Sequence, residues 1–144
     1  MENWHEYGQI LDRIERIMKA YFPQSGVNPE IEKWHQDEPV ITARWIGADG
    51  IERNINMYLD DSPENCSLRI SANAWRDDQT ERERRWIYHE FTDIDFSGWR
   101  KEFRVTILCV LINLLDIAFS KISSITDSDL TMNNKFPPNP AAKK

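Results

Sequence analysis

Glycine, cysteine and known catalytic motifs are all scarce in this 144-residue chain. The five glycines form neither a P-loop nor a GxGxxG dinucleotide loop, and no GxSxG nucleophile turn occurs. The two cysteines, Cys66 and Cys109, stand in apolar segments without a CxxC partner, so the common zinc-binding spacings are absent. We expect both to be buried, reduced thiols. The sequence does not decide whether they touch each other.

Histidine is also rare, and its spacing predicts no metal site. His35 lies near Asp37 and Glu38, but neither an HxxxH nor an HExxH pattern is present. Paired acids, such as those at 60–61 and 77–78, fall at predicted turns, where aspartate is favoured because it bonds the local backbone. We therefore expect no metal and no cofactor. The sequence leans against an enzyme without deciding the question.

An excess of basic residues is missing too, because 24 acids outweigh 18 bases and give a formal net charge of −6. Such a charge does not attract nucleic acid or an anionic membrane, but it would steer a basic protein toward the chain. The acidic N-terminus lacks a signal-peptide pattern, and the apolar segment Val105–Phe119 is shorter than the ~20 residues of a membrane span. We expect a cytoplasmic protein without membrane contact.

The first element present is an amphipathic helix, which we predict to end before Pro23. After it, residues 23–39 form a connector in which Asn28-Pro29-Glu30 opens one short helical turn carrying Ile31 and Trp34. The apolar residues of the helix recur every three to four positions and form one stripe: Ile10, Leu11, Ile14, Ile17, Met18 and Tyr21.

Alternation of apolar and polar residues then predicts four strands. The Asp49-Gly50 pair between the first two indicates a tight hairpin with a type I′ turn. In the last strand both sets of alternating residues include apolar side chains, so the sequence does not decide which set points into the core. The four predicted strands are Val40–Ala48, Ile51–Asp60, Cys66–Trp75 and Trp86–Thr92.

A long helix follows, capped by Asp95 or Ser97 and running from about Gly98 to Ile122. Twelve of the fifteen residues in its segment 105–119 are apolar. At about 100° per residue its polar positions fall within an arc of roughly 80°, so the helix must be covered on several sides. It is therefore either a central core helix or the interface of a homo-oligomer formed by Val105, Leu108, Leu111, Ile112, Leu115 and Phe119.

Together these elements predict one α+β domain over residues 1–122. Its sheet is a four-stranded antiparallel meander, with the amphipathic helix and the apolar helix packed on one face. Residues 123–144 are polar and rich in proline near the end, so we expect a flexible tail.

The outward parity of the strands collects Asn54, Asn56 and Asn73 beside aromatic and basic residues. Aromatic rings next to arginine and asparagine are typical of a ligand-binding or partner-binding face. An ordinary solvated sheet face has a similar composition, because these residues also suit cross-strand pairs. The candidate face consists of Arg44, Tyr58, Arg69, Trp75, Trp86, Tyr88 and His89.

This order of elements resembles that of small acidic secretion chaperones, which also pair helices with an antiparallel sheet and dimerise. The compact, motif-free chain is similar to proteins of unknown function encoded in mobile gene cassettes such as those of integrons. The leading hypothesis is a non-enzymatic binding protein that acts as a homodimer. The alternatives are a small-ligand-binding protein or enzyme with an aromatic pocket between sheet and helices, and an acidic immunity-type or chaperone-type protein that binds a basic partner.

Overall fold

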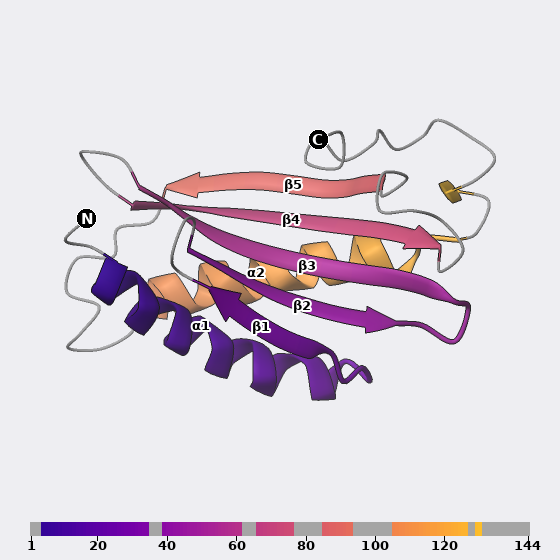
Figure 1. The fold of residues 1–144 in the computed structure, drawn as a ribbon, viewed down its shortest axis with the longest axis horizontal. Helices are drawn as coiled ribbons and strands as arrows, with labels where there is room; N and C mark the ends of the chain where they lie inside the picture. Colours follow the sequence, from indigo (N-terminus) through magenta and orange to yellow (C-terminus); the bar gives the residue numbers. More distant parts are fainter. Residues whose placement is uncertain are drawn as a thin grey trace.

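Five antiparallel strands, paired in the order in which they occur in the chain, form one sheet, and a helix precedes and follows them (Figure 1). The computed structural model describes residues 4–34, 39–61, 66–76, 85–93, 105–126 and 129–130. The predicted helix start near Gly98 and most of the predicted tail lie outside them. The elements are α1 (Trp4–Gln24), β1 (Glu30–Trp34), β2 (Val40–Ile46), β3 (Ile51–Asp61), β4 (Cys66–Arg76), β5 (Arg85–Asp93) and α2 (Val105–Ser123).

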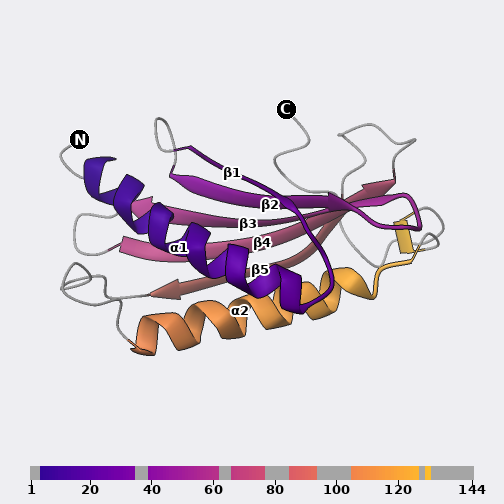
Figure 2. The same ribbon diagram turned by 90° about the horizontal axis from the view of Figure 1, so that it is seen from below.

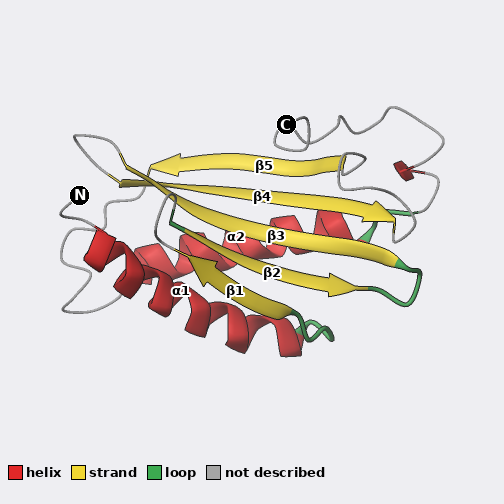
Figure 3. Ribbon diagram, in the orientation of Figure 1, coloured by secondary structure: helices red, strands yellow, loops and turns green. Residues whose placement is uncertain are grey.

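The predicted α+β class and the antiparallel sheet are confirmed, but the sheet has five strands rather than four. The segment predicted as a short helical turn is β1, an edge strand that pairs with β2 from Glu30↔Arg44 to Trp34↔Val40 (Figure 3). Pairing explains the difference: Ile31 lies opposite the core residue Ala43. A five-residue strand carries too short an alternation to be separated from a helical turn by sequence.

The amine of Lys33 holds β1 against α1. It donates to Asp12 and to Glu15 Oε1 at 2.6 Å. This donation holds the pKa of the Glu15 carboxyl below its usual value. The edge strand is thereby fixed over the flank of the core.

The first helix continues through Pro23, which contradicts the predicted end. Gly26, with φ of 85°, supplies the left-handed residue that stops it. The amide of Val27 donates to Phe22 O and the amide of Gly26 donates to Pro23 O, the paired bonds of a Schellman motif. Pro23 has no amide to donate to the carbonyl four residues earlier, so the last turn of α1 has one backbone hydrogen bond fewer.

The β2–β3 hairpin exists as predicted, but its turn is not of type I′. Gly50 has φ of 80°, whereas no described residue other than glycine has a positive φ, so Asp49 does not adopt the type I′ geometry. The amide of Gly50 donates to Gly47 O, and that of Gly47 donates to Ile51 O. These bonds define a three-residue loop that ends in a left-handed glycine.

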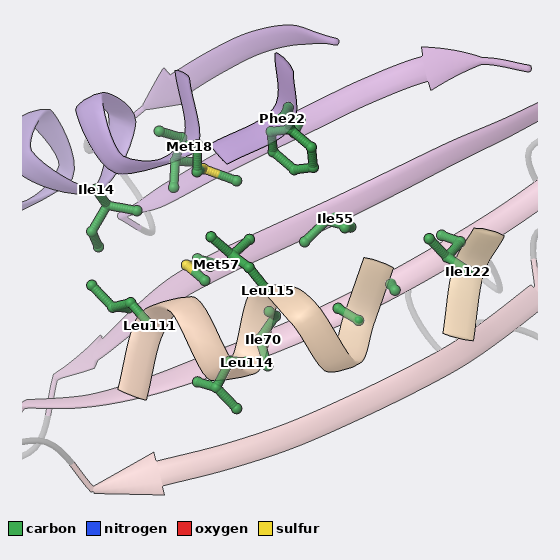
Figure 4. Packing of buried hydrophobic residues seen from close by; sticks show 14 of the residues in the cluster. Ile14, Met18, Phe22, Ile55, Met57, Ile70, Leu111, Leu114, Leu115 and Ile122 are labelled. Carbon is green, nitrogen blue, oxygen red and sulfur yellow. The ribbon is translucent and has the colours of Figure 1, made fainter. Parts of the chain in front are cut away.

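Both helices cover the same face of the sheet (Figure 2). The first helix lies over β1 and β2, and α2 lies over β3, β4 and β5. In Figure 4, Ile14, Met57, Leu111 and Leu115 converge between the helices and the sheet. The fully buried residues of this core include Leu11, Ile14, Met18, Phe22, Ile41, Ile55, Met57, Ile70, Leu111, Leu115, Ala118 and Ile122.

A β-bulge explains why the parity of the last strand could not be read. Ala72 pairs with Tyr88 but the next residue, Asn73, pairs with Trp86, so Ile87 is the extra residue. Tyr88 therefore lies on the face of Ala72, which the helices cover. Ile87 is also buried with the core. Both apolar parities of this strand are thus used, on either side of the bulge.

The second helix presents one exposed line to the outside, made of Cys109, Ile112, Asn113, Asp116 and Ser120. Cys109 is a free, exposed thiol, so the expectation of a buried one is wrong; the position lies on the same helix line as the polar residues. The side chain of Cys66 is outside the described part. Past the helix, Ile125 and Leu130 are buried in the core. No helix in the described ranges is long and apolar enough to cross a membrane.

Arg53 is a charged residue on the buried face, between Ile51 and Ile55, and is only 5% exposed. Its Nε donates to Ile122 O at 2.8 Å and its Nη2 to Ile125 O at 3.1 Å, at the end of α2. The same guanidinium donates twice to the carboxylate of Asp49, at 3.1 and 2.9 Å, and once to Ile51 O. All five of its N–H donors therefore have acceptors.

Replacing Arg53 by methionine keeps the apolar stem but removes these five bonds. We expect the free energy of unfolding to fall by about 3 kcal/mol, because the buried carbonyls of Ile122 and Ile125 lose their donors. Urea unfolding monitored by circular dichroism measures this. The control Arg44→Met removes a half-exposed arginine from the same sheet and is expected to change stability by less than about 1 kcal/mol. Equal losses at the two sites would contradict the assignment.

Asp49 makes this contact dependent on pH. Hydrogen bonding from Arg53 holds the pKa of the Asp49 carboxyl below its ordinary value. The ion pair is therefore fully present above the unfolded pKa of about 3.9 and is lost as the pH falls through the lower folded pKa. We expect the stability difference between the parent chain and Asp49→Asn to be constant from about pH 5 to 8 and to shrink below about pH 4. Denaturant unfolding across this range checks it, and a difference that does not shrink below about pH 4 would contradict it.

Candidate functional site: the helix-free face of the sheet and the interhelical groove

The face of the sheet turned away from α1 and α2 carries polar side chains in rows that run across the strands. Residues opposite each other in antiparallel strands share a face, so the register assigns each row. No described helix or strand packs on it, and we call it the helix-free face. One row is Glu32, Thr42, Asn56, Ser71 and His89, and the next is Glu30, Arg44, Asn54, Asn73 and Trp86.

The first of these rows is a chain of hydrogen bonds across three strands. Thr42 Oγ1 donates to Asn56 Oδ1 at 2.8 Å, and Asn56 Nδ2 donates to Ser71 Oγ at 3.3 Å. Asn56 and Ser71 are both buried although they lie on the helix-free face. Their bonds satisfy most of the polar atoms that burial would otherwise leave unpaired, so this row stabilises the sheet.

Asn54, in the neighbouring row, differs from Asn56. Its side chain is 5% exposed, yet its carboxamide forms no hydrogen bond with any residue in the described ranges. The opposite residue on β4 is Asn73, also buried, and the opposite residue on β2 is Arg44. A carboxamide offers two donor hydrogens and one acceptor oxygen, and neither polar atom of Asn54 is among the fully buried side-chain atoms of the described residues that lack a partner.

The arginines of this face are already engaged. Arg44 is paired with Glu30 at 3.3 Å and with Glu52 at 3.7 Å. The guanidinium of Arg69 lies over the ring of Tyr58, 4.1 Å from its centroid, in a cation–π contact. The face therefore offers hydrogen-bonding groups and aromatic rings, but little uncompensated positive charge.

Five of the seven residues predicted for the candidate face lie on the helix-free face: Arg44, Tyr58, Arg69, Trp75 and His89. The backbone of Trp86 pairs with Asn73 there, but its side chain lies outside the described part. Tyr88 is on the opposite side because of the bulge. Its ring lies 5.9 Å from the amine of Lys121 on α2, and partial burial raises the pKa of its hydroxyl.

A second feature is an apolar groove on the outside of the helix layer, with a volume of about 490 Å³. Ile17 and Ala20 of α1 and Leu108 and Ile112 of α2 provide its apolar walls. Ile112 is 38% exposed, one of two large hydrophobic residues that are exposed in the described ranges. Arg16, Tyr21, Gln24 and Asp116 supply its polar rim.

The end of this groove is fixed by a hydrogen bond between the helices. The hydroxyl of Tyr21 donates to Asp116 Oδ1 at 2.7 Å. Burial together with the neighbouring carboxylate raises the pKa of Tyr21 to about 12. Beyond this bond, Tyr21, Phe22, Trp45 and Phe119 form a cluster with ring centroids 5.2 to 6.2 Å apart.

The residues predicted as an oligomer interface divide between the core and this groove. Leu111 and Leu115 are fully buried within the chain, and Phe119 belongs to the aromatic cluster. Leu108 and Ile112 line the groove. The side chain of Val105 lies outside the described part.

A third hollow, of about 600 Å³, lies beside the β2–β3 hairpin and is lined in part by Trp45, Asp49 and Arg53. Because the donors of Arg53 are all used, its guanidinium is not available to hold an anion there. Within the described ranges no three His, Cys, Asp or Glu side chains are grouped so that they could hold a metal ion.

Sequence reasoning missed two of the residues that matter most. Arg53 shares the inward parity of its strand, but a charged residue at one inward position is easily read as an exception. Asn54 was assigned to the correct face, yet nothing in the sequence separates an amide that lacks partners from Asn56, which has them. Only the register and the hydrogen bonds make this distinction.

No protein-family model matches the chain, and no match to it is found among curated proteins or solved structures.

The two asparagines are expected to respond differently to substitution by leucine. Asn56→Leu leaves the hydroxyls of Thr42 and Ser71 without their shared partner and is expected to cost about 1–3 kcal/mol of stability. Asn54→Leu removes a buried amide without a bond and is expected to be neutral or stabilising. Urea midpoints at constant slope measure both. A similar loss in both variants would show that the Asn54 amide is bonded in solution.

Proposed function

We propose that this chain is a non-enzymatic binding protein that acts as a homodimer. The observation that carries the proposal is the apolar groove between α1 and α2, with Ile112 exposed on its wall. Exposed apolar surface that is contiguous and rimmed by polar groups is typical of an interaction site. Joining two copies here leaves the helix-free face of each sheet on the outside, available to a partner.

The groove is self-complementary, as a two-fold interface requires. Arg16 and Tyr21 are five residues apart on α1, which is about 7.5 Å along the helix axis. The hydrogen bond from Tyr21 to Asp116 places Asp116 of α2 at the same height along the helices as Tyr21. The two helices run in the same direction (Figure 2). A two-fold axis that lies in the plane of the interface and bisects the line from Arg16 to Asp116 brings Arg16 of one copy opposite Asp116 of the other, and the same operation pairs them a second time. In such a dimer the exposed arginine would gain an ion pair, and the apolar walls of the groove, Ile112 included, would be covered.

A binding pocket between the sheet and the helices, the first alternative, finds less support. The inner face of the sheet is filled by fully buried aliphatic residues such as Ile55, Met57 and Ile70. The aromatic residues Tyr58 and Trp75 lie on the helix-free face and not between the sheet and the helices. A ligand that used these rings would bind on that outer face.

Replacing Ile112 by glutamate tests the dimer, because it puts a charge into the proposed apolar contact. We expect the parent chain to be a dimer at tens of micromolar by gel filtration with light scattering. The variant should be monomeric, with a dissociation constant raised by about 100-fold or more. The variant should keep its fold, since the side chain is already partly exposed.

The matched control is Ile46→Glu, the same change at the other exposed large hydrophobic residue, which is 58% exposed and lies at the hairpin end of β2. It should stay dimeric. A monomeric parent chain would overturn the proposal, and equal dissociation in both variants would show that the groove is not the interface.

A further inference from the structure

The end of β2 extends beyond the strand that covers its outer edge. The pairing of β1 with β2 ends at Glu30↔Arg44, whereas β2 continues through Trp45 to Ile46 (Figure 3). We call Trp45 and Ile46 the tip of β2. Within the described ranges no strand lies beside the tip on this side. An unpaired strand edge is a template on which another extended chain can pair.

The backbone groups of Ile46 are directed at this open edge. In an antiparallel strand the N–H and C=O of successive residues point alternately to the two neighbouring strands. The amide of Gly47 donates to Ile51 O across the hairpin. The N–H and C=O of Ile46 therefore point the other way, to the side on which β1 has ended. The side chain of Ile46 is the more exposed of the two large hydrophobic residues that are exposed in the described ranges.

Two hollows flank the tip, one on each face of the sheet. The hollow of about 600 Å³ is on the face that the helices cover, because Trp45 and Arg53 share the inward parity and Ser123 is the last residue of α2. A hollow of about 470 Å³ is on the helix-free face, where Ile46 lies opposite Glu52. Both residues of the tip line both hollows. Successive side chains of an extended chain point to opposite faces, so a chain added at this edge would direct them alternately into the two hollows.

The hollow on the helix-covered face is suited to an apolar side chain. The ring of Trp45, which the aromatic cluster holds in place, lines it together with Val27 and Ala48. Asp49 and Arg53 also line this hollow, but they are bonded to each other. Burial of an apolar side chain against these walls is therefore the main contact that this hollow offers.

The hollow on the helix-free face is suited to a basic side chain. Two carboxylates, those of Glu30 and Glu52, line it with one guanidinium, that of Arg44. Arg44 is shared between them, at 3.3 Å from Glu30 and 3.7 Å from Glu52, and the side chain of Glu30 is 76% exposed. The formal charge of the whole chain, −6, also attracts a basic partner and repels an acidic one.

We infer that the tip of β2 binds an extended peptide segment in which basic and apolar side chains alternate. The segment continues the line of β1 and bonds to the N–H and C=O of Ile46. It places an apolar side chain against Trp45 and a lysine or arginine beside Glu30. Main-chain bonds to a strand edge provide affinity, and the side-chain hollows provide specificity.

The inference deepens the proposed function. It rests on the chain being a binding protein, and it names the class of partner and the surface that binds it. The two hollows share no lining residue with the groove between α1 and α2. Dimerisation across the groove therefore leaves the tip of β2 available.

The test titrates the full chain into a short fluorescent peptide in which lysine and valine alternate, and follows the fluorescence anisotropy at low salt. Two further peptides serve as comparisons: one with glutamate in place of lysine, and one with the same composition in which all lysines precede all valines. We expect the alternating basic peptide to bind at least about tenfold more tightly than either. A chain that binds none of the three, or all three equally, would overturn the inference.

Replacing Ile46 by proline tests the strand edge, because proline has no amide N–H. The lost N–H does not belong to the pairing with β3, and proline is tolerated at such edge positions, so the midpoint of urea unfolding should be unchanged. The alternating peptide should bind at least about tenfold more weakly. Ile46→Val is the matched control: it keeps the amide and should bind within about twofold of the parent. Proline-variant binding as tight as the parent's would contradict the role of the edge.

Glu30→Gln tests the charge without touching the backbone, and so stays informative if the proline variant unfolds. It removes one exposed carboxylate from the hollow on the helix-free face and should weaken binding of the alternating basic peptide by about threefold or more. Glu32→Gln is the matched control, at an exposed glutamate of the same strand and face that lines neither hollow. Equal losses at the two positions would mean a general charge attraction and would overturn the site.

Light scattering of the same samples separates this inference from the dimer. Ile112→Glu should bind the alternating basic peptide as the parent does, because its side chain lines only the groove. A monomeric chain that binds the peptide through Ile46 would overturn the dimer and keep the class of partner. A dimer that binds no peptide would do the reverse. A dimer that dissociates on Ile46→Pro would make the strand edge an interface between copies, and would overturn both.

Discussion

The hydrogen-bonded guanidinium of Arg53 is the constraint on which the layer order of this protein depends. The second helix is too apolar to be exposed to water on most sides, so it packs on the sheet. This packing buries backbone carbonyls at its C-terminal end. Arg53 supplies donors to two of those carbonyls and anchors itself to Asp49 in the hairpin turn. A Cβ at Gly47 would lie 2.5 Å from Arg53 Nη1, so a side chain at this position would displace the guanidinium. One side chain thus joins the hairpin, the sheet and the end of α2.

The consequence is an asymmetric sheet. Both helices are used on one face, and their apolar residues fill it from Ile10 of α1 to Ile122 of α2. The opposite face is left to amides, hydroxyls and aromatic rings. Cross-strand hydrogen bonds, rather than a covering helix, order the rows of this face. The register of the strands therefore sets the position of each polar group. Its placed hydrogen-bonding groups distinguish this face from the apolar interior.

The sequence is sufficient to predict the fold class, the exposed line along α2, and which residues face the core in three of the four predicted strands. All of these depend on long periodic patterns. It fails where one local event changes the pattern. A five-residue edge strand is too short to show its period, a bulge at Ile87 reverses the parity of β5, and Gly26 rather than Pro23 ends α1. The alternation along the strands also predicted most of the candidate face. Tyr88 was wrongly assigned to this face because the bulge cannot be detected in the sequence. Whether a side-chain amide forms hydrogen bonds depends on its neighbours on other strands, and a local sequence pattern does not show these neighbours.

The two surfaces also constrain each other. If two copies meet across the groove between α1 and α2, the helix layers lie in the middle of the assembly and the two helix-free faces point away from each other. Each face is then a separate site of modest size, and neither is blocked by the interface. A partner that repeats its binding groups would then engage both faces, and the linked contacts would bind more tightly than either alone. Dimerisation would therefore matter most for a partner that each face binds weakly, since a weak contact gains most from being presented twice.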